Sequence, residues 1–201
     1  MGTGCRARTG RRLKSSLFLL ILGMVSIGLG GTTRSQDSPS LKAVILYKQN
    51  QFWIPKEERD QEARNIHAAI LRGVKGNMVR AGWFIGISTQ ETSLVYLENE
   101  SGAGYSGMYW PLIKQELKAH GIHPKDLPEW CWKHRYELTE WGAGVFNGFC
   151  DKMGIQNAVK HWGPPDAQGD YLKQVKMRRF EYLRKVRRFE RIGIKKQGVA
   201  K

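Results

Sequence analysis

One acidic residue stands out in the sequence, because it ends an apolar helical pattern and precedes a glycine-rich stretch. It is Glu91, in the segment ISTQETSLVYLENESGAGYSGMYW of residues 87–110. A helix would align four residues that are spaced four apart: Val79, Trp83, Ile87 and Glu91. Three of them are apolar, so the pattern predicts a buried face. A carboxyl group withdrawn from water has a raised pKa, which suits a general acid near neutral pH.

The glycine-rich segment after Glu91 supplies groups that suit a ligand. Its glycines, Gly102, Gly104 and Gly107, allow a positive φ and a close approach of the backbone to a bound molecule. Aromatic side chains in or beside it offer flat faces that stack on sugar rings: Tyr105, Tyr109 and Trp110. Both features also have a plainer explanation. The acid can cap the next turn or pair with a lysine, and the loop can join two helices around core aromatic residues.

The elements that would position these residues are mostly helices. Acidic residues just after Pro55 predict a helix that ends near residues 73–76, and Asn77 is a suitable N-cap for the next helix. Further helices are predicted after Pro111, over WKHRYELTEWGAGVFNGFC, over MGIQNAVKHW and from Asp170 to about Ile192. SLKAVILYKQ fits a strand or the start of a helix, HPKDLPEW a turn and GAGYSG a loop.

The charge of the chain indicates an anionic partner. The 201 residues include 33 Lys and Arg against 18 Asp and Glu, a formal net charge of +15. This length suits one domain, and the charge suits nucleic acid, an anionic membrane or an anionic wall polymer.

The N-terminal segment favours export. Residues 1–14 are basic, the next residues are apolar, and polar residues follow to about position 37, which is the order found in secretory signals. Residues 1–37 are therefore expected to form a signal peptide, or an anchor to the inner membrane through residues 15–31, with a linker. The protein is expected to be periplasmic or secreted. In such a compartment Cys131 and Cys150 either pair or remain buried thiols, and their spacing indicates no metal site.

Four short motifs in order resemble the soluble-type lytic transglycosylases of the lysozyme-like superfamily. That family carries Glu-Ser, then Ser-x-x-Gly-x-x-Gly-Leu-Met-Gln, then Ala-Tyr-Asn-Ala-Gly, then Tyr-Val-x-x-Val. Glu91-Thr92 corresponds to the first motif, and the second is matched in register by Ser101, Gly104 and Gly107, with Met108 at the position of the family's leucine. The third is similar to Val145-Phe146-Asn147-Gly148 and the fourth to Tyr171-Leu172-Lys173-Gln174-Val175, so the resemblance covers about residues 60–180.

The resemblance implies a lysozyme-like helical domain over residues 38–190, with a glycine-rich active-site loop. It implies a lyase that cleaves between N-acetylmuramic acid and N-acetylglucosamine in peptidoglycan. Glu91 would act first as acid and then as base, leaving 1,6-anhydro ends, with no cofactor and no metal. The residues expected to bind the glycan are Ser101, Gly104, Tyr105, Ser106, Gly107, Tyr109, Trp110, Phe146, Asn147 and Tyr171.

Departures from the family pattern keep other functions open. Thr92 replaces a serine, Trp110 stands where the family has a glutamine, and Phe146 lacks the hydroxyl of the family's tyrosine. A hydrolytic muramidase would use two carboxylates. The pair Glu98-Asn99 is similar to one in chitinase-like endolysins, which also hydrolyse glycans. A catalytically degenerate wall-binding protein is the third alternative.

The C-terminal residues are strongly basic. Residues 173–201 contain twelve Lys and Arg and two Glu, and residues 191–201 are expected to form a basic tail. This region suits an anionic membrane or wall polymer, although a solvated helix face explains the charge equally well. Export argues against nucleic acid as the partner.

Overall fold

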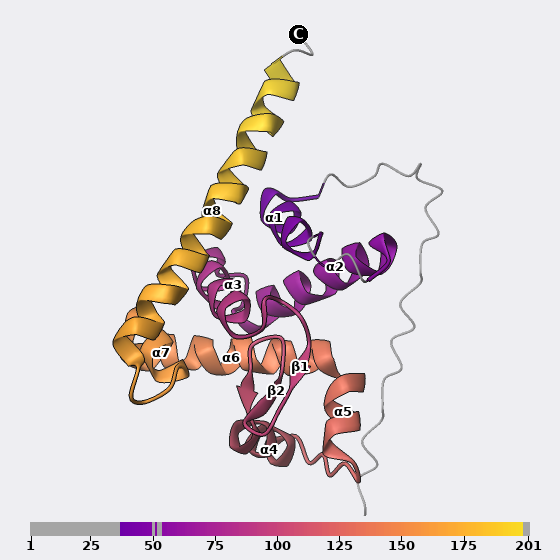
Figure 1. Cartoon of the computed structure of the whole chain (residues 1–201), viewed down its shortest axis with the longest axis vertical. Helices are drawn as coiled ribbons and strands as arrows, with labels where there is room; N and C mark the ends of the chain where they lie inside the picture. The colour runs from indigo at the N-terminus through magenta and orange to yellow at the C-terminus, as the bar shows by residue number, and fades with distance from the viewer. Residues whose placement is uncertain (1–36, 50, 52–53, 199–201) are drawn as a thin grey trace, which may run out of the picture. The chain divides into compact units, whose positions relative to one another are not determined.

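The computed structural model describes residues 37–49, 51 and 54–198, and most of them are helical (Figure 1). The predicted signal or anchor, residues 15–31 included, lies outside the described residues. The helices are α1 (Pro39–Lys48), α2 (Lys56–Gly73), α3 (Met78–Thr92), α4 (Trp110–Ala119), α5 (Leu127–Lys133), α6 (Arg135–Met153), α7 (Ile155–Trp162) and α8 (Gln168–Gly198). The strands are β1 (Leu97–Glu98), β2 (Gly102–Gly104) and β3 (Met108–Tyr109).

Side-chain caps explain where several helices begin. The Asn77 side chain accepts a hydrogen bond of 3.1 Å from the Arg80 amide at the start of α3, which confirms the predicted cap. Ser38 accepts from the Leu41 amide at 3.2 Å, so the ambiguous segment SLKAVILYKQ is helical. Asp126 accepts from the Glu129 amide at 2.9 Å and starts α5, where a turn was predicted. α8 continues through residue 190 to Gly198, beyond the expected start of a separate tail.

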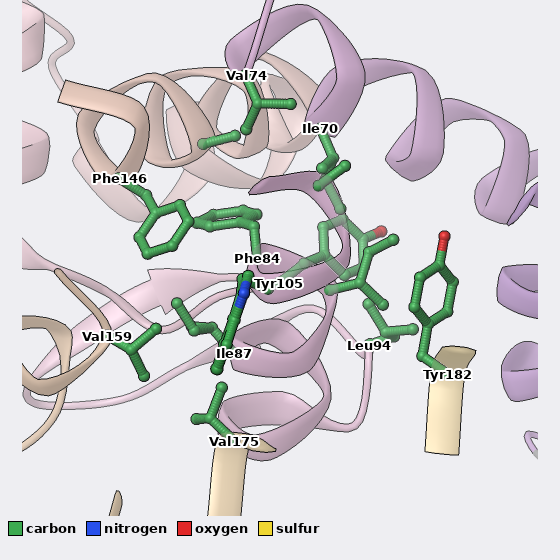
Figure 2. Close-up of a cluster of buried hydrophobic side chains, with 14 of the residues drawn as sticks. Ile70, Val74, Phe84, Ile87, Leu94, Tyr105, Phe146, Val159, Val175 and Tyr182 are labelled. Atoms are coloured by element: carbon green, nitrogen blue, oxygen red, sulfur yellow. The ribbon is translucent and has the colours of Figure 1, made fainter. Parts of the chain in front are cut away.

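Helix α3 forms the centre of the main core. Residues 81–89 are all buried, so the helix is enclosed on every side rather than along one stripe. Trp83 and Ile87 are buried as predicted, but Val79 is 55% exposed, because it lies in the first turn before the neighbouring helices close around α3. Figure 2 shows Phe84 and Ile87 of α3 among side chains from α2, α6, α7 and α8. The predicted buried stripe therefore holds only over the middle of the helix.

The strands form a small antiparallel sheet with the order β1-β2-β3. In the register, Glu98 faces Ala103, and Ala103 faces Met108. Part of the predicted GAGYSG loop is therefore strand β2. The sheet packs on a second hydrophobic cluster from α4, α5 and α6, made by Ala103, Met108, Ile113, Leu117, Cys131 and Leu138. Cys131 lies in this cluster and Cys150 in the main core, and both are buried free thiols.

The crossing of α2 and α6 depends on a missing side chain. A Cβ atom on Gly73 would lie 2.3 Å from the Glu140 carbonyl oxygen and 2.6 Å from the Ala143 Cβ. Gly73→Ala is therefore expected to lower the free energy of unfolding by about 1–3 kcal/mol, because the two helices must separate. Urea unfolding monitored by circular dichroism measures this change.

Gly144 is the matched control for Gly73, because it lies at the same crossing. Its added Cβ would meet nothing closer than the Gly73 carbonyl oxygen at 3.9 Å. Gly144→Ala should leave stability unchanged or raise it by up to about 1 kcal/mol through helix propensity. Equal losses from both alanine variants would contradict the close packing described for Gly73.

Candidate active site around Glu91

Glu91 lies in the last turn of α3, and its neighbour Thr92 fixes the start of the chain that follows. The Thr92 Oγ1 hydroxyl lies 2.9 Å from the Ser88 carbonyl oxygen and 2.6 Å from the Tyr105 carbonyl oxygen, and these two acceptors share its one proton. Ser93 then ends the helix in the left-handed conformation, with a φ of 54°. The end of α3 and the loop after β2 are thus tied together beside Glu91.

Gly107 brings backbone directly against the Glu91 side chain. A Cβ atom on Gly107 would lie 3.1 Å from Glu91 Oε2 and 3.5 Å from both Glu91 Cβ and Cγ. The φ of Gly107 is +60°, which side chains other than glycine rarely adopt. Gly107 was expected to let the backbone approach a bound molecule; in the structure it brings the backbone against the candidate catalytic acid.

Tyr171, in the first turn of α8, is the polar group that acts on Glu91 from the other side. Its side chain is buried, and burial followed by the charge of Glu91 raises the pKa of the Tyr171 hydroxyl. Gly163 lies against the ring, because an added Cβ there would be 2.4 Å from Tyr171 Cγ. The Tyr171 hydroxyl oxygen is itself buried, and it makes no hydrogen bond of ordinary length and angle within the described residues. It lies close enough to Glu91 to affect the pKa of that carboxyl group.

The surroundings of Glu91 raise the pKa of its carboxyl group. Burial by neighbouring protein atoms is the larger cause, and the nearby hydroxyl of Tyr171 lowers the pKa in part. The residue is nevertheless exposed overall, so a substrate can reach it. The two observations are compatible, because crowding on one side of a carboxyl group disfavours its charge even when the other side faces water.

No second carboxylate acts on Glu91 among the described residues. The charge of Glu98 acts instead on the pKa values of Tyr96 and Cys131, raising both. Glu98 and Glu100 are exposed on and beside β1. The site therefore offers one perturbed acid rather than a facing pair.

Two of the predicted ligand-binding residues hold the loop in place from inside. Tyr105 is fully buried, and Figure 2 shows its ring in the core. Its hydroxyl donates to Glu62, which also pairs with the buried Lys48. Ser106 is buried, and its carbonyl oxygen accepts a hydrogen bond of 3.1 Å from Trp162 Nε1. Both residues position the backbone next to Gly107, and their side chains are not free for a ligand.

Three further predicted residues lie together at the end of the sheet. The Trp110 amide donates to the Ser101 carbonyl oxygen at 3.1 Å, and Trp110 Nε1 donates to the Asn99 carbonyl oxygen at 2.9 Å. Tyr109 is 57% exposed beside them and is two residues from Gly107. Gly104 has a φ of +98° and lies against Leu138. Its positive φ serves packing against α6.

Phe146 and Asn147 lie elsewhere. The Phe146 ring packs in the core, 5.7 Å from the Phe84 ring and 6.3 Å from the Trp162 ring. Asn147 Oδ1 accepts from Arg80 Nη1 at 2.6 Å, at the opposite end of α3 from Glu91. Arg80 and Glu91 are eleven positions apart in the helix, about 16.5 Å along the axis. The structure therefore does not bring Asn147 to the predicted acid.

No local pattern in the sequence pointed to several residues that build the site. Trp162 and Gly163, which hold Ser106 and Tyr171, lie at the end of α7 and just after it, in a segment read only as a short helix and its stop. Lys48 and Glu62 come from α1 and α2 and look like ordinary surface charges in the sequence. Their roles depend on contacts between distant segments, which no local pattern reveals.

Other features of the described residues set limits on the chemistry. No group of three His, Cys, Asp or Glu side chains in residues 37–49, 51 and 54–198 is arranged to hold a metal ion. None of the helices described is both long and apolar enough to cross a membrane.

Comparison with protein-family models, with curated proteins and with solved structures finds no match to the chain.

Proposed function

We propose that the chain is an exported peptidoglycan lytic transglycosylase with a lysozyme-like fold, in which Glu91 is the catalytic acid. The observation that carries this proposal is the position of Glu91. A carboxyl group with a raised pKa ends a buried helix and lies against the backbone of Gly107, with the hydroxyl of Tyr171 acting on it. The mostly helical fold of the described residues also supports the proposal, because the resemblance implies a helical domain.

A single perturbed acid favours transglycosylation over hydrolysis. Hydrolytic glycosidases use two carboxylates that flank the scissile bond. Glu98 and Glu100 follow Glu91 in the sequence and are exposed on and beside β1, and neither contributes to the raised pKa of Glu91. The reaction that needs one acid is an intramolecular transfer, in which the substrate supplies its own nucleophile.

The proposed reaction starts from protonated Glu91. Its proton passes to the oxygen between the muramic acid and glucosamine rings, and the bond from that oxygen to the muramoyl C1 breaks. The substrate's acetamide oxygen stabilises the positive charge at C1. Glu91, now a carboxylate, then takes the proton of the muramoyl 6-hydroxyl as its oxygen bonds to C1. Glu91 is protonated again, and the products are a 1,6-anhydro end and a free 4-hydroxyl.

The environment of Glu91 predicts how activity depends on pH. The acid must be protonated to start the reaction, so the rate is expected to fall as pH rises through the Glu91 pKa, which lies above the ordinary value of 4.5. The nearby hydroxyl of Tyr171 lowers this pKa. Tyr171→Phe should therefore move the alkaline limb of the kcat/KM profile to higher pH. The exposed Tyr109 is the control, because Tyr109→Phe should leave the limb in place.

The products of wall digestion test the proposed reaction. The wild-type chain is incubated with purified murein sacculi, and the released ends are identified by mass spectrometry. Anhydro-muramic ends are expected. Reducing ends would instead indicate a hydrolytic muramidase or an endolysin-like hydrolase, and Glu98 and Glu100 would become the candidates for a second carboxylate.

A wall-binding protein without catalytic activity is the second candidate. The positions of Phe146 and Asn147 favour it, because neither side chain lies where the resemblance implies that it contacts the glycan. Such a protein would sediment with sacculi and release no product. Binding and cleavage measured on the same preparation separate the two candidates.

A further inference from the structure

The side of α8 that faces away from the protein carries a regular row of exposed residues. They alternate at spacings of four and three, which keeps them along one face of a helix. We call this set the outer row: Lys173, Met177, Phe180, Arg184, Arg187, Arg191 and Ile194. All seven are exposed. The row is therefore not part of the packing of this chain.

The other side of α8 fixes the direction in which the row faces. Leu172, Val175 and Tyr182 are buried in the main core, and Figure 1 shows α8 running beside α3 and α1. The Arg179 guanidinium lies over the Trp83 ring of α3, 4.6 Å from its centroid. Because the inner side is bound over much of its length, α8 cannot rotate to bury the outer row.

The outer row combines two chemistries that are seldom exposed together. Met177, Phe180 and Ile194 are 56%, 63% and 69% exposed, and large apolar side chains at such exposure have a free-energy cost in water. Arg184, Arg187 and Arg191 lie between them and form no ion pair within the described residues. Two surface hollows follow the row, and both are lined by Phe180 and Arg184. Apolar and cationic side chains thus share one continuous surface.

Charge and apolar exposure together point to one kind of partner. Residues 173–194 contain nine Lys and Arg and two Glu, which favours an anionic surface. A polyanion in water would attract the arginines but would give Met177, Phe180 and Ile194 nothing to bury against. A lipid interface accepts both, because arginine reaches the headgroups while its stem and the apolar side chains enter the acyl boundary.

We propose that the outer row of α8 binds the surface of a bilayer that contains anionic phospholipids. Helix α8 lies in the plane of the interface, with Phe180 and Ile194 entering it and the three arginines bound to headgroup phosphates. This contact is separate from the predicted N-terminal anchor, and it does not depend on the proposed glycan chemistry.

A fluorescent reporter on the row tests this contact in the full chain. Cys5→Ser and Met177→Cys leave one accessible thiol, because Cys131 and Cys150 are buried, and that thiol carries an NBD group. With vesicles of equal phosphatidylglycerol and phosphatidylcholine, NBD emission is expected to rise by about twofold or more, because the label enters a less polar region. Brominated acyl chains should quench it. Pure phosphatidylcholine vesicles should give little change.

Matched variants distinguish the effect of the outer-row arginines from the effect of the net charge of the chain. Arg184→Gln, Arg187→Gln and Arg191→Gln together should abolish most of the rise, since each cationic residue near the surface contributes about 1 kcal/mol. Three exposed lysines elsewhere are the control: Lys114→Gln, Lys118→Gln and Lys125→Gln. They remove the same charge and should leave the rise intact.

Substitution of the apolar residues distinguishes binding to a lipid surface from binding to a soluble polyanion. Phe180→Ser with Ile194→Ser should remove the quenching by brominated lipid at unchanged charge. The proposal fails if the reporter does not respond to anionic vesicles, or if the lysine control lowers the response equally. It also fails if heparin gives the same rise and the serine variants do not alter it, because the row would then be a polyanion surface.

Discussion

Glu91→Gln is expected to lower the rate of murein cleavage by about 100-fold or more, because glutamine cannot donate the proton that the leaving oxygen requires. The substitution keeps the size of the side chain and so should leave Gly107 in place. Release of soluble fragments from labelled sacculi measures the rate. The stability of the variant should equal or exceed that of the wild type near neutral pH. Glutamine removes a carboxyl group whose charge is disfavoured by burial, as its raised pKa indicates.

Two other glutamate variants are the controls for Glu91. Glu98→Gln and Glu100→Gln make the same chemical change at exposed positions near the sheet. Both should retain activity within about twofold, as expected for surface substitutions away from the site. A large loss at either position would contradict a one-acid reaction and support hydrolysis with two carboxylates.

Glu62→Ala is expected to lower the free energy of unfolding by about 3 kcal/mol or more, because it leaves a buried ammonium group without its counter-ion. Lys48 is fully buried, and its Nζ donates to the Leu94 carbonyl oxygen at 2.8 Å while it pairs with Glu62. Burial already lowers the pKa of Lys48, and Glu62 raises it in part. The Tyr105 hydroxyl would lose its acceptor as well. Urea unfolding measures the total loss.

A second ion pair and a double variant sharpen this test. Arg72 and Glu140 pair at 2.7 Å on the surface, so Arg72→Met should cost less than about 1 kcal/mol. Lys48→Met combined with Glu62→Gln removes both charges and should recover much of the loss. If Glu62→Ala were no more harmful than Arg72→Met, the pair would not act as a buried ion pair.

The sequence predicts well those parts of the fold that local chemistry determines. Asn77 caps α3 because its side chain can reach an amide in the first turn, which needs no information from the rest of the chain. Burial depends on neighbours, and Val79 is exposed because no neighbouring element covers its side chain in the first turn of α3. The sheet was missed because each strand has only two or three residues, too few for an alternating pattern.

The candidate site also contains some contacts that local sequence predicts and others that depend on distant segments. Glu91 and Gly107 are adjacent in space as the motif spacing indicates, since a helix end and a short sheet connect them. Tyr171 acts on Glu91 from α8. Asn147 lies far away because its direction is set by Arg80 and Asp151, which bind the start of α3 to α6. Motif order alone could not reveal that orientation.

Tyr171, which acts on Glu91, and the outer row belong to one unbroken helix. The geometry of α8 therefore determines the distance between Glu91 and a membrane bound to the outer row. A helix is about 10 Å across with its side chains, so an enzyme lying flat on this row would keep Glu91 within a few nanometres of lipid headgroups. Strands in the innermost layer of a wall would be in reach, and strands farther out would not. The position of α8 on the membrane, rather than the reaction at Glu91, would then determine how deep in the wall cleavage occurs.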